Sequence, residues 1–241
     1  MTPTLVSSDP RTAPDIPVPR CPAGLRPSWA ASQVFAAALR GESCRVIGMD
    51  DEVIVLPAWK WLGQIDSGDS QLLDRCVGPT VDIGCGPGRM TKALLARGVQ
   101  TLGIDVVAEA VELTRARGGV ALQRDVFTAL PGEGRWQTAL LADGNIGIGG
   151  DPVRLLQRTA RLLRADGRIV VDLSPPGGDV RVHRISLEVS GARSRRFPWA
   201  IVPADRLACL AEAAALRVSE VVEHDGRWFA ALHKSVLTCP R

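Results

Sequence analysis

Residues 81–88 read Val-Asp-Ile-Gly-Cys-Gly-Pro-Gly, and a helix is expected to follow from Arg89 to Arg97. An apolar run that carries one acidic residue and ends in glycines is typical of a buried strand entering a tight turn. A second strand, residues 100–104, ends at Asp105. The order strand, glycine loop, helix, strand and acid indicates an α/β protein that binds an adenosine-containing cofactor.

The same alternation of strands and helices continues beyond this unit. Further strands are expected at residues 121–123, 136–142 and 168–173, and helices at 108–117 and 152–163. Near the end of the chain, Asp225-Gly226 separates two strand-like runs, which predicts an antiparallel hairpin. The predicted fold class is therefore α/β, with a doubly wound, mostly parallel seven-stranded sheet that finishes in an antiparallel C-terminal hairpin.

The chain before this core differs in composition. Residues 1–27 carry seven prolines and are expected to form a flexible arm. Residues 28–77 are expected to form an N-terminal cap segment, with a helix to Arg40, a small hairpin at 45–56, and a helix capped by Asp69. The main domain is expected to span residues 78–241, with an inserted β-hairpin at about 178–202.

Composition excludes several classes of protein. The net charge of the 241 residues is +3, which does not favour a nucleic-acid partner. The six cysteines form no C-x-x-C pair, so no metal site is expected. No apolar segment is long enough for a membrane helix and no signal pattern opens the chain, so a cytoplasmic location without a membrane partner is predicted.

The glycine loop itself distinguishes between cofactors. A dinucleotide site uses the spacing G-x-G-x-x-G, whereas this chain has G-x-G-x-G with Arg89 where the third dinucleotide glycine would stand. Asp82 lies just before the loop, where a carboxylate would repel a pyrophosphate but would attract an ammonium or sulfonium group. This pattern favours S-adenosylmethionine, an adenosine without phosphates that carries both cations.

Acidic residues also follow the later strands. Asp105, Asp125 and Asp143 stand at or just beyond the ends of three strands, in addition to Asp82. Because parallel strands bring their carboxyl ends to one edge of the sheet, these four carboxylates are expected to converge there.

With these motifs, residues 78 to about 175 resemble class I S-adenosylmethionine-dependent methyltransferases of small-molecule type, and the C-terminal hairpin is similar to the closing strands of that fold. The resemblance implies that Asp82 binds the methionine amino group and that Asp105 takes both ribose hydroxyls. It implies that Asp125 and Val126 recognise adenine, and that Asp143 lies near the sulfonium. The implied cofactor-binding residues are Asp82, Gly84, Cys85, Gly86, Asp105, Val106, Asp125, Val126 and Asp143.

The acceptor side is less determined by the sequence. His183 is the first candidate for a general base, and Asn145 and Asp143 are further catalytic candidates. Asn145 is equally well explained as a turn former. The arginine-rich segment that contains Arg195 could receive an anionic substrate, but it is better explained as a solvated basic hairpin. The predicted acceptor-binding residues are Trp59, Trp61, Asn145, Arg195 and Trp199.

The sequence thus predicts a methyltransferase, monomeric or homodimeric, that acts on a small molecule, with secondary metabolism as one setting. Three alternatives stay open: a non-methylating enzyme that uses bound S-adenosylmethionine, a nicotinamide-dependent oxidoreductase, and a non-enzymatic interaction module. The acceptor and the atom that is methylated cannot be derived from these residues.

Overall fold

The computed structural model describes residues 29–49 and 54–235. The arm expected at residues 1–27 lies outside the described residues, and so does part of the connection expected within the small N-terminal hairpin. Within the described ranges, no helix combines the length and the apolar character of a membrane span.

Seven strands of the described chain form the central sheet. They are β3 (Thr80–Ile83), β4 (Thr101–Asp105), β5 (Val120–Gln123), β6 (Trp136–Leu141), β7 (Leu163–Leu173), β11 (Leu216–His224) and β12 (Arg227–Lys234). Their order is β11-β12-β7-β6-β3-β4-β5. The five strands from β7 to β5 run parallel, and β12 pairs antiparallel with both β7 and β11. The predicted fold class is confirmed.

Helices cover both faces of this sheet. They are α3 (Ser67–Leu73), α4 (Arg89–Ala96), α5 (Ala108–Ala116), α6 (Pro152–Leu162) and α7 (Leu207–Ala213). Strand β7 shows why the arrangement is doubly wound: Ile169 and Val171 pack in the core beneath α6 and α7, whereas Val170 packs in the core beneath α3 and α4. Because successive side chains point to opposite faces, a strand covered on both sides reads as a continuous apolar run.

A second sheet arises from two segments that are far apart in the chain. Its strands are β1 (Cys44–Ile47), β2 (Ile54–Val55), β8 (Arg181–Val189), β9 (Ala192–Arg193) and β10 (Phe197–Ile201). Strand β8 pairs with β10 on one side and with β1 on the other, where Cys44 faces Val189. The N-terminal segment and the inserted hairpin, which the sequence presents as separate features, therefore share one sheet.

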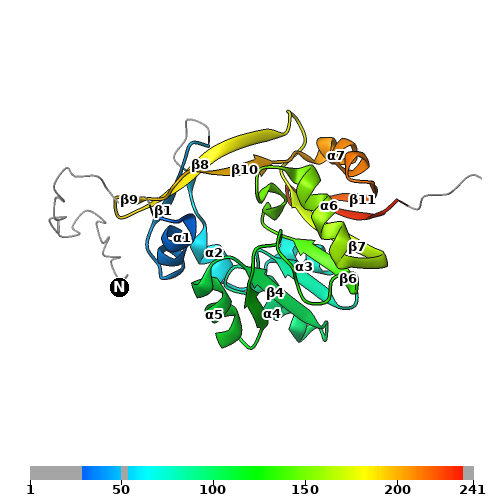
Figure 1. Ribbon diagram of the computed structural model, residues 1–241, viewed down its shortest axis with the longest axis horizontal. Helices are drawn as coiled ribbons and strands as arrows, with labels where there is room; N and C mark the ends of the chain where they lie inside the picture. Colours follow the sequence, from blue (N-terminus) through cyan, green and yellow to red (C-terminus); the bar gives the residue numbers. More distant parts are fainter. Residues whose placement is uncertain (1–28, 50–53, 236–241) are drawn as a thin grey trace, which may run out of the picture.

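The second sheet is held over one end of the central sheet. In Figure 1, β8 and β10 run together across the top of the view toward α1 (Ala31–Leu39) and β1. Leu39 of α1 packs with Val107 and Ala110 at the start of α5. Helix α2 (Ala58–Leu62) continues this layer. This layer thus lies over the carboxyl ends of the parallel strands. At these ends, β3 has β4, the next strand along the chain, on one side and β6, a later strand, on its other side. That reversal of strand order is the position at which open α/β sheets bind ligands.

One local prediction was wrong. Asp69 does not cap the helix that precedes β3, because the helix begins at Ser67 and Asp66 accepts the capping hydrogen bond from the Asp69 backbone amide. The Asp69 side chain is instead fully buried, at 0% exposure.

Candidate functional site

A cavity of about 680 Å³ lies between the carboxyl edge of the central sheet and the second sheet. The glycine loop after β3 forms one wall, together with acidic residues at the ends of β4 and β7 and in the segments that follow β5 and β6. Helices α1 and α2 and strands β8 and β10 form the opposite wall. A cavity of this size holds ligands of small-molecule dimensions.

Two glycines of the loop have different surroundings. Gly84 has φ +70°, and a Cβ atom there would lie 2.7 Å from Nδ2 of Asn145, so the backbone is packed against the next loop. Gly86 has φ +53°, and a Cβ atom there would meet nothing within 4 Å. Since Gly86 also lines the cavity, its bare backbone forms an open cradle against which a ligand can lie closely.

Asp105, at the end of β4, is aimed into the cavity by the backbone. Its Oδ2 accepts from the Gly86 amide at 2.9 Å and its Oδ1 accepts from the Val107 amide at 2.8 Å. Burial raises the pKa of this carboxyl, and the amides of Val107 and Gly86 oppose that rise. Each oxygen keeps a further lone pair, so the carboxylate can accept from the two hydroxyls of a vicinal diol.

Asp82 lies beneath the loop and is only 1% exposed. Its Oδ2 accepts from the Thr91 hydroxyl at 2.7 Å. Burial raises the pKa of Asp82 from 3.8 to about 7; the Thr91 hydrogen bond opposes the rise, and the nearby carboxylates of Asp143 and Asp105 add to it. A buried carboxyl of this kind gains from a cationic ligand, because the cation offsets the cost of its ionisation.

Asp82→Asn is expected to stabilise the ligand-free protein at pH 8 and to leave its stability nearly unchanged at pH 4. The pKa of Asp82 is about 7 in the folded protein and 3.8 for an ordinary aspartate, as in the unfolded chain. Ionisation of Asp82 therefore lowers the stability of the folded protein as the pH rises between these values, and the loss persists above pH 7. Asparagine avoids the charge and can still accept from Thr91. Urea unfolding should show a gain of about 4 kcal/mol at pH 8, since a pKa difference of one corresponds to about 1.4 kcal/mol. A loss of stability at pH 8 would contradict this account.

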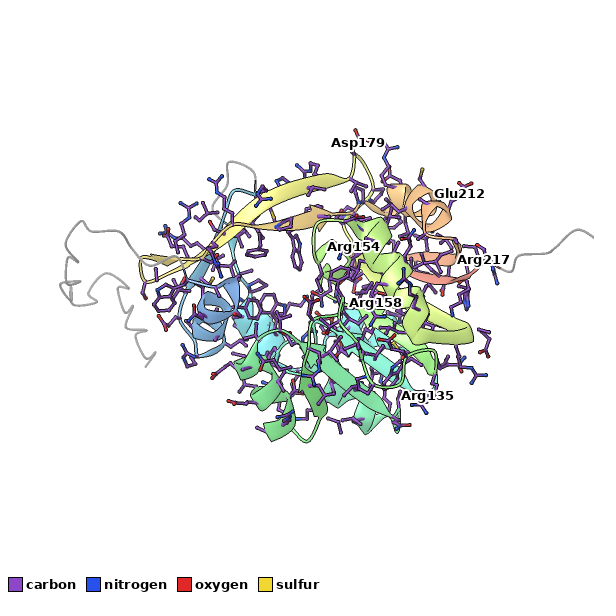
Figure 2. All side chains as sticks on the ribbon, in the orientation of Figure 1. Arg135, Arg154, Arg158, Asp179, Glu212 and Arg217 are labelled. Carbon is purple, nitrogen blue, oxygen red and sulfur yellow. The ribbon has the colours of Figure 1, made fainter. Side chains whose placement is uncertain are left out.

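The segment after β5 carries the pair Asp125 and Val126. Asp125 is exposed, and its Oδ1 accepts from the Phe127 amide at 2.9 Å, whereas Val126 is 4% exposed. Helix α6 holds this segment: Arg158 Nε donates to the Val126 carbonyl at 2.7 Å, and the Arg154 guanidinium lies 4.5 Å from the centre of the Phe127 ring. Both arginines are labelled along α6 in Figure 2. The segment therefore lines the cavity in a fixed conformation.

Asp143, which follows β6, is held by a buried arginine. Nη2 of Arg89 donates to both of its oxygens, at 3.0 and 2.7 Å, and Nη1 of Arg89 contacts Asp69 of α3. Asp69 also accepts from Arg227 of β12 at 2.9 Å. Arg89, which replaces a glycine of the dinucleotide pattern, therefore connects the glycine loop to the segment after β6 and to α3.

Asn145 also lines the cavity, but its side chain is engaged by the backbone. Its Nδ2 donates to the carbonyls of Ile83 at 2.9 Å and Gly84 at 3.0 Å. These bonds join the loop after β6 to the glycine loop. They favour the structural explanation of Asn145 over a direct contact with the acceptor.

Asn145→Ala is expected to lower the free energy of unfolding by about 1–2 kcal/mol, since two carbonyls at the head of the glycine loop lose their donor. The change should appear in the midpoint of a urea transition followed by circular dichroism. Unchanged stability accompanied by loss of turnover would instead assign Asn145 to the acceptor.

Only some of the residues predicted to bind the acceptor line the cavity. Trp61 and Trp199 line the cavity, whereas Trp59, at 78% exposure, does not. Arg195 and the candidate base His183 do not line the cavity either. His183 shares a face of β8 with two lining residues, Ile185 and Leu187, but lies farther along the strand, opposite Trp199 in β10.

Four charged residues that line the cavity were not predicted as site residues from the sequence: Lys60, Arg89, Arg124 and Asp172. Asp172 lies near the end of β7, where its Oδ2 accepts from Arg227 at 2.8 Å. Burial raises the pKa of Asp172, Arg227 opposes the rise, and Asp143 adds to it. Lys60 of α2 lines the cavity too, with its Nζ 3.6 Å from Asp66. The signal for Asp172 was available, since it follows the same rule of an acid at a strand end that identified Asp105.

Comparisons with known proteins agree with this geometry. Residues 80–167 match a family model described as a methyltransferase domain. A search of the curated proteins gives no match to the sequence.

Several solved structures are similar to this chain over a larger part of its length. An S-adenosylmethionine-dependent methyltransferase from Bacteroides fragilis, solved with S-adenosyl-L-homocysteine, has a TM-score of 0.71 at 19% identity, covering 86% of this chain and 94% of that one. The CcbJ methyltransferase from Streptomyces caelestis has a TM-score of 0.55 at 15% identity, covering 73% and 92%. The 1,6-didemethyltoxoflavin-N1-methyltransferase from Burkholderia thailandensis has a TM-score of 0.53 at 22% identity, covering 69% and 76%. At these identities the likeness shows the fold.

Proposed function

We propose, from the premise that the chain carries a class I methyltransferase domain, that it transfers a methyl group from S-adenosylmethionine to a small-molecule acceptor. The observation that carries the proposal is the acid-lined glycine cradle: Gly86 is open to the cavity, Asp105 is aimed beside it, and Asp82 is buried beneath it.

The residues of the cavity fit this cofactor better than a dinucleotide. A dinucleotide places a pyrophosphate on the glycine loop, where Asp82, Asp105 and Asp143 would oppose its negative charge. S-adenosylmethionine brings two cations and no phosphate to the same position. The charge of the site therefore supports the methyltransferase over the nicotinamide-dependent alternative.

In this proposal each part of the cofactor has a partner in the chain. Asp105 accepts from the ribose hydroxyls, the Gly86 backbone lies against the ribose and methionine portions, and Asp82 compensates the amino group from below. The Asp125 side chain and the backbone amide of Val126 hydrogen-bond to adenine. Gly84, Cys85 and Val106 line the same part of the cavity, and Asp143 lies toward the methyl group.

Bound S-adenosylmethionine supplies a methyl group on a sulfonium centre, and the chain has to orient an acceptor and exclude water. The second sheet lies over the carboxyl edge of the central sheet and would shield this side of the cavity from solvent. Trp61 and Trp199 belong to the wall that would position the acceptor. If the acceptor releases a proton, Asp172 and Asp143 are our candidates to receive it. They are preferred to His183 because both line the cavity and His183 does not.

The acceptor is proposed to be a small molecule because the second sheet forms one wall of the cavity and the cavity volume, about 680 Å³, is of small-molecule dimensions. The toxoflavin-type acceptor belongs to the Burkholderia enzyme and indicates only that this fold accommodates such molecules. A role in secondary metabolism, a cytoplasmic location and a monomeric or dimeric state stay predictions from the sequence.

The test is incubation of the purified chain with methyl-labelled S-adenosylmethionine and a panel of small-molecule acceptors. Methyl transfer should place the label in a product and release S-adenosylhomocysteine. Turnover of an added substrate without label transfer would replace the proposal by the non-methylating alternative. Binding of neither S-adenosylmethionine nor its product would overturn both.

A further inference from the structure

The wall of the cavity opposite the glycine loop has a composition of its own. It is formed by α1, α2, the second sheet and the described residues of the connection between the two helices (41–49 and 54–57), and we call this part the acceptor chamber. Its apolar side chains include Phe35, Ile54, Leu56, Trp61, Phe197 and Trp199. The rings of Phe35 and Trp61 stack with their centroids 5.3 Å apart, which gives the chamber a flat aromatic surface.

Charged groups are scarce on this wall. Among the described residues that α1, α2 and the second sheet contribute to the cavity, Lys60 alone is charged, and its Nζ lies 3.6 Å from Asp66. A sugar or an amino acid would have to give up hydrogen bonds to water here and would find few replacements. An apolar ring system loses no such bonds and gains by leaving water.

A polar group nevertheless lies where this wall meets the central sheet. Asp172 lines the cavity from β7, with Lys60 of α2, Arg227 of β12 and Asp143 as its charged neighbours. Arg227 holds Oδ2 at 2.8 Å, and within the described residues no hydrogen bond reaches Oδ1. An O–H or N–H group of a ligand in the chamber can therefore donate to Oδ1.

We infer that the acceptor chamber takes a molecule with an apolar aromatic body and one O–H or N–H group, which donates a hydrogen bond to Asp172. The inference rests on the proposed function, because it names the acceptor class of the same site. Shape and apolar contact with the aromatic wall supply affinity, and the bond to Asp172 sets which end of the molecule faces the glycine loop.

The test uses the full chain saturated with S-adenosylhomocysteine and three probes: 2-naphthol, naphthalene and methyl glucoside. Equilibrium dialysis should show binding of both naphthalene compounds and binding of methyl glucoside at least 100-fold weaker. The cofactor product is titrated first in the same samples. Its failure to bind would count against the proposed function, whereas failure of 2-naphthol to bind would count against this inference alone.

A matched pair of variants examines the wall. Ile54 and Val55 are neighbours on β2; Ile54 lines the cavity, whereas Val55 is 54% exposed and does not. Ile54→Asp should weaken 2-naphthol binding by about 10-fold or more, since the probe would bury an unpaired charge, and Val55→Asp should not. If the aspartate prevents folding, Ile54→Thr and Val55→Thr provide the same comparison. Equal effects at the two positions would overturn the inference.

Asp172→Asn tests the proposed hydrogen bond between the ligand and Asp172. The measurement is the affinity of 2-naphthol relative to that of naphthalene, which a purely structural role of Asp172 would leave unchanged. In the unchanged chain, 2-naphthol should bind about 10-fold more tightly than naphthalene, because its hydroxyl donates to a charged group. In Asp172→Asn this advantage should fall several-fold, while naphthalene binding stays the same. An advantage of the same size in both proteins would remove Asp172 from the proposal.

Discussion

Asp69→Ala is expected to lower the free energy of unfolding by about 3–5 kcal/mol, one of the largest effects available in this chain. Asp69 has 0% exposure and contacts two arginines, Arg89 and Arg227. Its removal leaves both guanidiniums with one fewer anion, and Arg89 itself is 5% exposed, so water cannot replace the lost contact freely. Asp69 also accepts from the Asp66 backbone amide at 3.1 Å, which the variant loses.

The measurement is a urea transition followed by circular dichroism, with Asp74→Ala as the matched control. Asp74 pairs with Arg97 at 2.8 Å, but its side chain is 57% exposed and that of Arg97 is 30% exposed. An exposed pair of this kind contributes at most about 1 kcal/mol. If the two variants unfolded at the same urea concentration, the buried connection through Arg89 would have no special importance.

Asp105→Ala is expected to weaken binding of S-adenosylhomocysteine by about 100-fold or more while the fold is retained. In the proposed complex, the carboxylate accepts from two ribose hydroxyls, and two hydrogen bonds to a charged group at about 1.5 kcal/mol each correspond to that factor. Asp105→Asn keeps one acceptor oxygen and should show an intermediate loss.

Titration calorimetry provides the comparison, with Asp179→Ala as the control. Asp179 is a surface acid, 86% exposed, that pairs with Arg206 and is labelled at the outer edge of the molecule in Figure 2. Its removal should leave the affinity unchanged. An Asp105→Ala protein with normal affinity and a normal circular dichroism spectrum would sink the ribose assignment.

The cofactor half of the site could be predicted because its signals are local. The glycine loop, Asp82 and Asp105 lie within one strand–helix–strand unit, and the sheet geometry places the ends of β3 and β4 at the same edge. The sequence spacing alone was enough to bring Gly86 and Asp105 together, and the structure shows them hydrogen-bonded at 2.9 Å.

The acceptor half could not be predicted because it depends on pairing between distant segments. Cys44 and Val189 face each other across β1 and β8, although 145 positions separate them, and no local pattern specifies that register. The position of His183 depended on the same unknown, since only the path of β8 decides which of its residues reach the cavity.

Arg89 illustrates a third situation, in which the residue was noticed but its partners were not. Its place after the glycine loop argued against a dinucleotide, yet nothing in the sequence showed that Asp69 would be buried against it. Asp69 resembled a helix cap because acids commonly begin helices. A buried ion pair between two helices is a tertiary property, and only the packing of α3 on α4 reveals it.

Calorimetric titration of the unchanged protein with S-adenosylmethionine and, separately, with NADH tests directly whether the acid-lined glycine loop holds a cationic, phosphate-free adenosine. We expect saturable binding of one equivalent of S-adenosylmethionine and no binding of NADH. Binding of NADH without binding of S-adenosylmethionine would contradict this expectation, because a pyrophosphate would then be accepted beside Asp82.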